Sequence, residues 1–260
     1  MDTIVLHVQT DDPDNNSKCE WIGNKVRDYF VSNFSMPTSA RALCYLDDHD
    51  SAWLKEQWGG TSNRGIHWPL RGQGLSDWPQ DMWNTIAPPD PDSGNITWPY
   101  DSIVYLHGST CDMEVQLAMT LAHELQHFLQ FANQRQIWAI NMLLAKLAYL
   151  PTPDLSHWYD LPTERDARII GKRVAVSIFG KSRVDDHIGM MARGNSSLED
   201  SADWEFIGTL DSNETYDLRM ATALLVEKHR RALDALRTTF ARDGDLGTVS
   251  LDISTHGARE

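Results

Sequence analysis

The apolar and polar positions in the first hundred residues predict a short α/β segment followed by an irregular one. Residues 3–9 and 40–46 are apolar runs of strand length, and residues 19–34 carry large apolar side chains at helical spacing. Strand, helix and strand in this order open an α/β layer. Residues 50–100 are instead rich in Trp, Gly, Pro and Asp, which predicts a long irregular region whose aromatic side chains argue against disorder. We interpret it as loops held to the core by indole rings, as an aromatic wall of a substrate cleft, or as both.

The second half of the chain has mainly helical periodicity. Residues 101–107 are one more apolar run of strand length, and residues 111–133 are apolar at nearly every position, which predicts a helix buried on most sides. Residues 194–203 are expected to form a polar connection, and residues 244–260 a loose tail with one short strand at 248–253. Further helices are expected at 136–150, 162–179, 185–193 and 214–243.

These elements predict one α+β domain over residues 1–260. It has a small N-terminal mixed sheet and a mainly helical C-terminal half. The α/β part is expected to end at about residue 133, and the helical part to cover about residues 134–243. No internal repeat divides the chain.

The start of the long buried helix carries a capping signal. Ser109 precedes Asp112 by three residues, which is the spacing of a capping box. Asp112 and Glu114 then fall in the first helical turn, where the helix dipole favours anions. With Gly108 as a tight turn, the pattern predicts that the helix begins at about Cys111.

Composition and charge narrow the classes of protein to consider. The chain is 41% hydrophobic and 23% charged, which is typical of a globular protein rather than a disordered one. Its formal net charge of -14 argues against nucleic acid or an anionic membrane as the main partner. Three cysteines without a C-x-x-C spacing form neither a disulfide framework nor a thiolate zinc site. No signal peptide or membrane-length apolar run is visible, so we expect a cytoplasmic protein.

The main candidate for a functional site is the five-residue segment from His123 to His127, with the sequence His-Glu-Leu-Gln-His. Imidazoles four residues apart project from one face of a helix, so both can bind a single Zn²⁺. Glu124 can reach over the metal, to the place of a bound water molecule. The pattern predicts zinc-assisted hydrolysis, most often of peptide bonds. The alternative is a buried polar pair that is satisfied without a metal, because such groups are costly to bury alone.

This motif resembles the signature of the zincin superfamily of zinc metallopeptidases. The resemblance implies a motif helix that follows an antiparallel edge strand, which binds the substrate in extended form. Residues 101–107 stand where that strand is expected. A catalytic zinc needs a third protein ligand and one open position. The metzincin branch would require Gly at position 130 and His at position 133, and Gln130 and Asn133 exclude it.

The thermolysin-like branch, the gluzincins, takes a Glu from a following helix, and here the resemblance points to Glu164. Pro162 marks a helix start and places Glu164 in the first turn, pointing toward the motif helix. The alternative without a metal is an exposed salt bridge between Glu164 and Arg168, which lies four residues further along the chain. Other candidates for the third ligand are His157, Asp160 and Asp166.

One position departs from the gluzincin pattern. Members of the thermolysin kind carry Asp four residues after the ligand Glu, where this chain has Arg168. Asp166 is expected to face roughly the other side of its helix and to cap Thr163. The residue that orients the ligand histidines is therefore not identified by the sequence.

The resemblance implies a zinc-dependent peptidase, an endopeptidase, acting on a protein or peptide. Glu124 would be the general base for a zinc-bound water, with His123, His127 and Glu164 as ligands. Tyr159 and His157 are candidates for stabilising the oxyanion. The alternatives are a zincin-like sensor or binding module without catalysis, and a zinc hydrolase of a non-peptide amide. The oligomeric state is not predicted.

Overall fold

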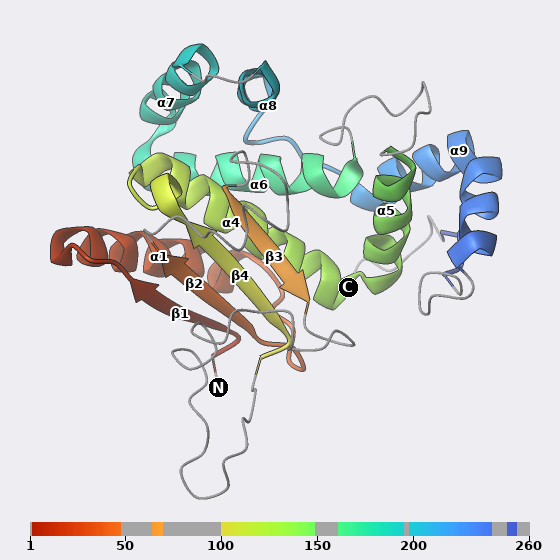
Figure 1. Cartoon of the computed structure of the whole chain (residues 1–260), viewed down its shortest axis with the longest axis horizontal. Helices are drawn as coiled ribbons and strands as arrows, with labels where there is room; N and C mark the ends of the chain where they lie inside the picture. The colour runs from red at the N-terminus through yellow and green to blue at the C-terminus, as the bar shows by residue number, and fades with distance from the viewer. Residues whose placement is uncertain are drawn as a thin grey trace, which may run out of the picture.

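The structure is a computed structural model that describes residues 2–47, 64–69, 100–148, 161–194, 198–240 and 249–253. These residues form a mixed α+β fold with a four-stranded sheet and a larger set of helices (Figure 1). The α+β class, the small mixed sheet and the mainly helical second half are therefore confirmed for the described part of the chain.

The sheet has the strand order β1-β2-β4-β3. Strands β1 (Ile4–Gln9), β2 (Ala42–Asp47) and β4 (Ser102–His107) are parallel, and their positions confirm the three predicted strands. Strand β3 (Gly65–Pro69) runs antiparallel to β4 and was not predicted.

The prediction that residues 101–107 form the edge strand is wrong. β4 lies inside the sheet, between β2 and β3, and in the described residues the edge on this side is β3. The five residues of β3 lie in the segment that was expected to be irregular, and they end at Pro69. Proline is tolerated at an edge strand, where one side of the strand makes no ladder hydrogen bonds.

One face of the sheet packs against helices α1 (Pro13–Asn33) and α4 (Glu114–Asn133), which lie behind the strands in Figure 1. α1 begins earlier than the apolar pattern predicted, because its first turns are polar. Its start is set by Asp12, whose carboxylate accepts a hydrogen bond from the backbone N–H of Asp14 at 3.0 Å, and by Pro13 in the first turn. The apolar core joins the inner face of the sheet to these two helices.

The predicted capping box before α4 is wrong. Residues Gly108–Thr110 form a 3₁₀ turn, in which Gly108 adopts a φ of 55° that favours glycine. Ser109 accepts a hydrogen bond from the backbone N–H of Asp112 through its carbonyl oxygen, at 3.2 Å. α4 begins only at Glu114, after Met113, and has no side-chain cap.

The remaining helices are α5 (Arg135–Ala148), α6 (Pro162–Phe179), α7 (Lys181–Gly194), α8 (Leu198–Thr209) and α9 (Leu218–Phe240). α5, α6, α7 and α9 confirm predicted helices, with shifted ends. The polar connection expected at 194–203 is wrong from residue 198 onward, where α8 begins. α8 forms because its later turns bury Trp204 and Ile207, beyond the stretch that looked polar. None of the helices in the described residues is long and apolar enough to cross a bilayer.

A second apolar cluster joins α5 to α9, at the side of the molecule away from α7 and α8 (Figure 1). Residues 249–253 pack on it through the buried Leu251. Gln136 holds them by donating to the carbonyl oxygens of Ser250 and Asp252 at 3.2 and 3.0 Å. The strand predicted at 248–253 is therefore wrong over residues 249–253, and the parts of the tail that were expected to be loose lie outside the described residues.

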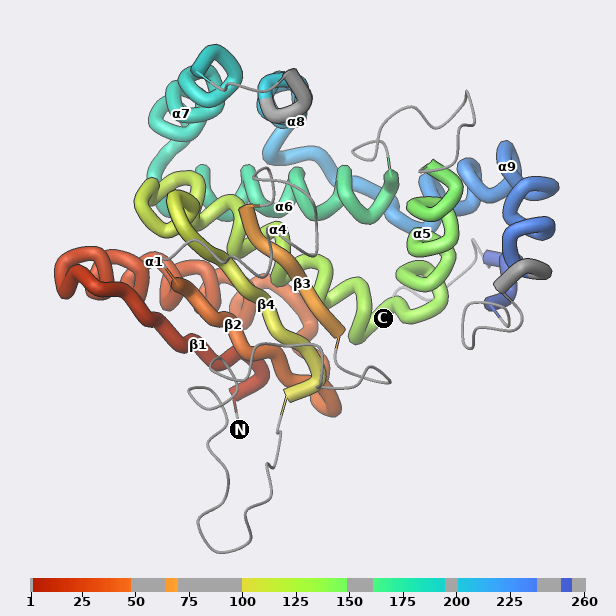
Figure 2. Tube along the Cα trace, in the orientation of Figure 1, coloured from red at the N-terminus to blue at the C-terminus, as the bar shows by residue number. Residues whose placement is uncertain are grey.

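Helices α4 and α6 lie against each other, as the tube in Figure 2 shows. Gly171 makes the close approach possible, because a Cβ at this position would lie 2.7 Å from the carbonyl oxygen of Met119 on α4. The packing brings the first turn of α6 beside the middle of α4.

Candidate metal centre

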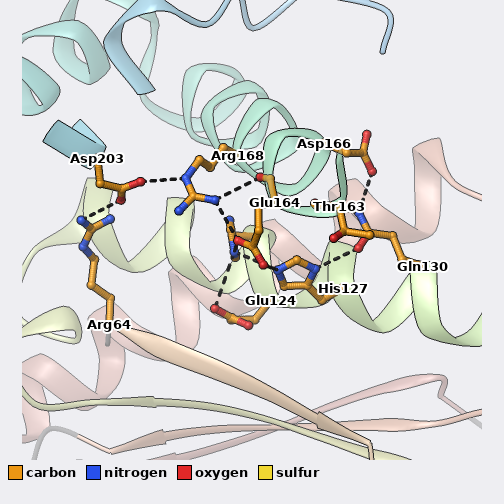
Figure 3. A network of polar contacts seen from close by, with 10 residues as sticks. Arg64, Glu124, His127, Gln130, Thr163, Glu164, Asp166, Arg168 and Asp203 are labelled. Carbon is orange, nitrogen blue, oxygen red and sulfur yellow. Dashed lines mark hydrogen bonds and ion pairs between the residues drawn. The ribbon is translucent and has the colours of Figure 1, made fainter. Parts of the chain in front are cut away.

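The three predicted zinc ligands meet where α6 crosses α4 (Figure 3). The Nε2 atoms of His123 and His127 lie 3.0 Å apart. Glu164 places Oε1 at 3.2 Å from His127 Nε2 and Oε2 at 3.4 Å from His123 Nε2. His127 and Glu164 are buried and His123 is partly exposed. Within the described residues, no other three His, Cys, Asp or Glu side chains meet in this way.

The spacing of the donor atoms fits a zinc ion. Ligands about 2.0–2.1 Å from a tetrahedral zinc lie about 3.3 Å from one another. The 3.0 Å between the two Nε2 atoms and the 3.2 Å between His127 Nε2 and Glu164 Oε1 are close to that edge length, and the 3.4 Å contact of His123 Nε2 is with the other carboxylate oxygen, Oε2. Two imidazoles and one carboxylate also match a catalytic donor set, which leaves a fourth position open. The residues present therefore fit zinc in both chemistry and geometry.

The local sequence explains why Glu164 points at the histidines. α6 begins at Pro162, after Leu161 as the N-cap residue, so Glu164 lies in the first turn. Glu164 is 2% exposed, a burial that a carboxylate tolerates when charged or hydrogen-bonding groups surround it. The third-ligand prediction thus corresponds to a residue that the structure brings to the two histidines.

Gln130 orients the ring of His127. The amide nitrogen of Gln130 donates to the carbonyl oxygen of Thr163 at 3.1 Å and to Asp166 Oδ2 at 2.8 Å. These two bonds leave Gln130 Oε1 as the acceptor for His127 Nδ1–H, at 2.9 Å. A proton fixed on Nδ1 directs Nε2 toward the cluster as the ligand atom.

Asp166 supports this arrangement, and the prediction that it caps Thr163 is wrong. Its Oδ2 accepts hydrogen bonds from Gln126 at 2.7 Å and from Gln130 at 2.8 Å, both on α4. Burial raises the pKa of Asp166, although the two amides and the nearby charges oppose the shift. Asp166 faces α4 because the first turns of α6 are buried on that side, where long glutamine side chains can reach it.

Arg168 forms the predicted ion pair with Glu164, but the pair is buried rather than exposed. Arg168 Nη1 lies 2.8 Å from Glu164 Oε2, and the two side chains are 7% and 3% exposed. Arg168 Nε also donates to Asp203 Oδ1 on α8 at 2.8 Å. The position at which the resemblance implies an Asp that orients a histidine thus holds an Arg that contacts the glutamate.

Charge is concentrated at this site. Burial alone would lower the pKa of His127, but the carboxylates of Glu164 and Glu124, and the hydrogen bonds that the imidazole donates to Glu164 and Gln130, raise it to about 9. Burial alone would raise the pKa of Glu164, but His127 and His123 hold it well below its ordinary value. Without a metal, the site therefore contains an imidazolium beside a carboxylate at neutral pH.

Glu124 lies beside the ligand group without joining it. Its Oε1 is 3.9 Å from His123 Nε2, and its side chain is largely buried. Figure 3 shows Glu124 on the sheet side of the His127 ring, while Glu164 comes from α6 on the other side. A carboxylate in this place can accept a proton from a molecule bound at the centre of the cluster.

Aromatic residues that the sequence did not point to border His127. Trp138 of α5 lies edge-on to His127, with ring centroids 5.5 Å apart, and edge-on to His67 of β3 at 5.4 Å. Burial and the charge of His127 hold the pKa of His67 well below its ordinary value, so His67 is neutral. The sequence did not place His67 beside the site, because β3 itself was not predicted.

Several predicted site residues are outside the described part of the chain. His157, Tyr159 and Asp160 fall between the described segments that end at residue 148 and begin again at residue 161. The predictions for an oxyanion stabiliser and for these alternative ligands stay predictions. Most of residues 50–100, including the proposed aromatic wall, is also outside the described segments.

Comparisons with known proteins gave no match. No family model, no curated protein and no solved structure matches the chain. The assignment of a function therefore depends on the geometry of the site itself.

Proposed function

We propose that the protein is a zinc-dependent hydrolase of zincin type that cleaves peptide bonds as an endopeptidase. His123, His127 and Glu164 hold the zinc, and Glu124 is the general base. The observation that carries the proposal is the meeting of two imidazole Nε2 atoms and the Glu164 carboxylate, at separations of 3.0 to 3.4 Å, beside a second carboxylate, Glu124, that is not a ligand.

The side chains divide the chemistry among them. Zinc, when bound, polarises a carbonyl group and lowers the pKa of water. Glu124 takes a proton from the attacking water molecule and later donates it to the leaving amine. Gln130 keeps the ring of His127 in the orientation that this centre needs.

Strand β3 is the element that supports a peptide substrate in this proposal. It is the strand that lies against α4 at the edge of the described sheet, and in those residues it pairs with β4 on one side. An extended peptide can add to such an edge by main-chain hydrogen bonds. The role that the resemblance gave to residues 101–107 thus passes to Gly65–Pro69. The net charge of -14 supports a peptide, and in particular a cationic one, over nucleic acid.

The test is the substitution Glu124→Gln, which keeps the shape of the side chain and removes the base. The variant is expected to bind zinc as the wild type does and to lose about 10²–10⁴-fold in the rate of peptide cleavage. A fluorogenic peptide library and an unfolded protein serve as substrates, with cleavage sites mapped by mass spectrometry. Glu114→Gln, on the same helix but paired with Arg183 at the surface, is the matched control. A Glu124→Gln variant that cleaves as fast as the wild type would refute the mechanism.

A non-catalytic zincin-like module is the second candidate, and one observation favours it. The ion pair with Arg168 and the contacts with two imidazoles satisfy Glu164 without a metal. The two readings differ in metal content and in the effect of a chelator. Bound zinc together with chelator-sensitive cleavage supports the peptidase, whereas a metal-free folded protein without hydrolytic activity supports the module. Cleavage of amides other than peptides would point to the third reading, a zinc amidohydrolase.

A further inference from the structure

An unbroken row of ion pairs runs from Glu164 to the start of β3 (Figure 3). Glu164 Oε2 contacts Arg168 Nη1 at 2.8 Å, and Arg168 Nε contacts Asp203 Oδ1 at 2.8 Å. The second oxygen of Asp203 contacts Arg64 Nη2 at 3.0 Å. The four residues come from α6, α8 and the segment that leads into β3, so elements far apart in the sequence meet behind one ligand.

Arg168 distinguishes the two oxygens of the Glu164 carboxylate. Nη1 of Arg168 is bound to Oε2 and also donates to the backbone carbonyl oxygen of Glu164, at 3.2 Å. Both oxygens face the cluster, with Oε1 at 3.2 Å from His127 Nε2 and Oε2 at 3.4 Å from His123 Nε2, but only Oε2 is also bound by Arg168. A charge-assisted hydrogen bond to one oxygen draws it away from a metal and leaves the other as the stronger ligand.

Asp203 fixes the direction in which Arg168 points. A guanidinium on a flexible side chain could turn away from Glu164, but Asp203, which is partly buried, holds its Nε at 2.8 Å. Asp203 is itself anchored, because α8 is fastened at its end by Lys172. The Lys172 ammonium donates to the carbonyl oxygens of Ile207, Gly208 and Leu210 at 2.8–3.2 Å.

Arg64 completes the support from the other side of Asp203. Its guanidinium stacks on the ring of Trp204 at 4.2 Å from the centroid, and Trp204 is 1% exposed. Asp203 is therefore held between two arginines, one of which is stacked on a buried indole. The carboxylate of Asp203 balances the charge of Arg168, and this allows a second cation to lie close to the site without an unpaired buried charge.

We propose that Arg168 and Asp203 are positioning residues for the third metal ligand. They hold Glu164 to a single ligand oxygen, and this preserves the open position in which water and substrate bind. The proposal depends on the zinc centre proposed above and adds a function for the residue that departs from the gluzincin pattern. Without Arg168, both oxygens of Glu164 are free to bind the metal, and the open position is occupied.

Cobalt in place of zinc reports the number of ligand atoms directly, because the visible absorption of Co²⁺ is strong with four ligands and weak with five or more. The wild-type protein is expected to show the strong bands. Arg168→Met keeps the apolar stem of the side chain and removes the guanidinium, and its cobalt bands are expected to fall by about half or more as the coordination number rises. The shorter ammonium of Arg168→Lys can still donate to Oε2 and is expected to restore part of the lost intensity.

The matched control is Arg165→Met on the same helix, because Arg165 pairs with Glu214 at 3.3 Å, away from the ligands. Its cobalt spectrum is expected to equal that of the wild type. Asp203→Asn keeps a neutral acceptor for Arg168 and is expected to weaken the bands less than Arg168→Met does. If Arg168→Met fails to fold by circular dichroism, Asp203→Asn and Arg168→Lys decide the question by the same bands.

Three results would overturn the proposal in different ways. Strong wild-type bands that stay unchanged in the folded Arg168 and Asp203 variants would refute the positioning role and leave the metal centre intact. A wild-type protein that retains no cobalt would refute the metal centre, and with it the proposed function, whereas bound cobalt with only weak wild-type bands would refute the single ligand oxygen of Glu164.

Discussion

Zinc binding at neutral pH is expected to release about one proton, and the proton comes from His127. Burial works to lower the pKa of this imidazole, but Glu164, Glu124 and Gln130 raise it to about 9, above the ordinary value of 6.5. In the metal-free protein at pH 7, both ring nitrogens are therefore protonated. Nε2 must lose its proton before it can bind a metal. Glu164 contributes no proton, because its pKa is held well below its ordinary value.

The size of the effect follows from the distance between pH 7 and that pKa. Two pH units below the pKa, the apparent affinity for zinc is lower by about 100-fold, or about 3 kcal/mol, than at a pH well above it. The affinity is expected to rise about tenfold for each pH unit between 7 and 9 and to level off above that range. The affinity rises with pH because the pKa of His127 is raised, since a histidine with a lowered pKa would release no proton at pH 7.

Isothermal titration calorimetry measures the released protons. The enthalpy of zinc binding at pH 7 is measured in PIPES, HEPES and TES, which bind zinc only weakly, and its slope against the ionisation enthalpy of the buffer gives the number of protons. His7→Gln, at the opposite edge of the sheet, is the control and should not change the slope. Zinc binding with a slope near zero at pH 7 would refute the charge state assigned to His127.

Two further substitutions test the support of the site. Gln130→Ala removes the acceptor of His127 Nδ1–H and is expected to lower zinc affinity by about 10- to 100-fold, measured by competition with a chromogenic chelator; an unchanged affinity would show that Gln130 does not orient the ring. Gly171→Ala places a Cβ 2.7 Å from the carbonyl oxygen of Met119. It is expected to destabilise the fold by about 1–3 kcal/mol in urea unfolding, because α4 and α6 must separate. A Gly171→Ala protein as stable as the wild type would contradict the close contact of these helices.

The sequence predicts those elements whose signal is local. β1, β2, β4 and α4 carry apolar runs or periodicity that appear in a single window of sequence. β3 has no such signal, because five residues in a segment rich in Trp, Gly and Pro become a strand only by pairing with β4. α8 was missed for a similar reason, since Trp204 and Ile207 lie beyond the stretch that looked polar.

The residues of the candidate site also differ in whether a local sequence signal predicts them. The histidines and Glu124 come from one motif, and Glu164 comes from a resemblance combined with a helix start. Gln130 and Asp166 depend on how α6 lies against α4, which no local pattern predicts. One signal was present, because a glutamine on an almost wholly apolar helix must find a hydrogen-bond partner when it is buried. That rule predicts a partner for Gln130 but does not name it.

The role of Arg168 could not be read from its spacing alone. Four residues after Glu164, it is placed for an exposed ion pair on a helix surface. Arg168 is instead buried, and its Nε pairs with Asp203 on α8, a helix that the sequence did not predict. The ligand group was thus accessible to sequence reasoning, and the contacts that hold it were not.

Zinc content of the purified protein decides whether the metal centre exists. The protein is loaded with zinc, freed of excess by gel filtration, and analysed by plasma mass spectrometry alongside folded His127→Ala and Glu164→Gln variants. We expect about one zinc per wild-type chain and about a tenth of that or less in each variant, because three ligands are the minimum for a stable catalytic site. A wild-type protein that retains no zinc, or variants that retain as much as the wild type, would contradict the assignment of His123, His127 and Glu164 as its ligands.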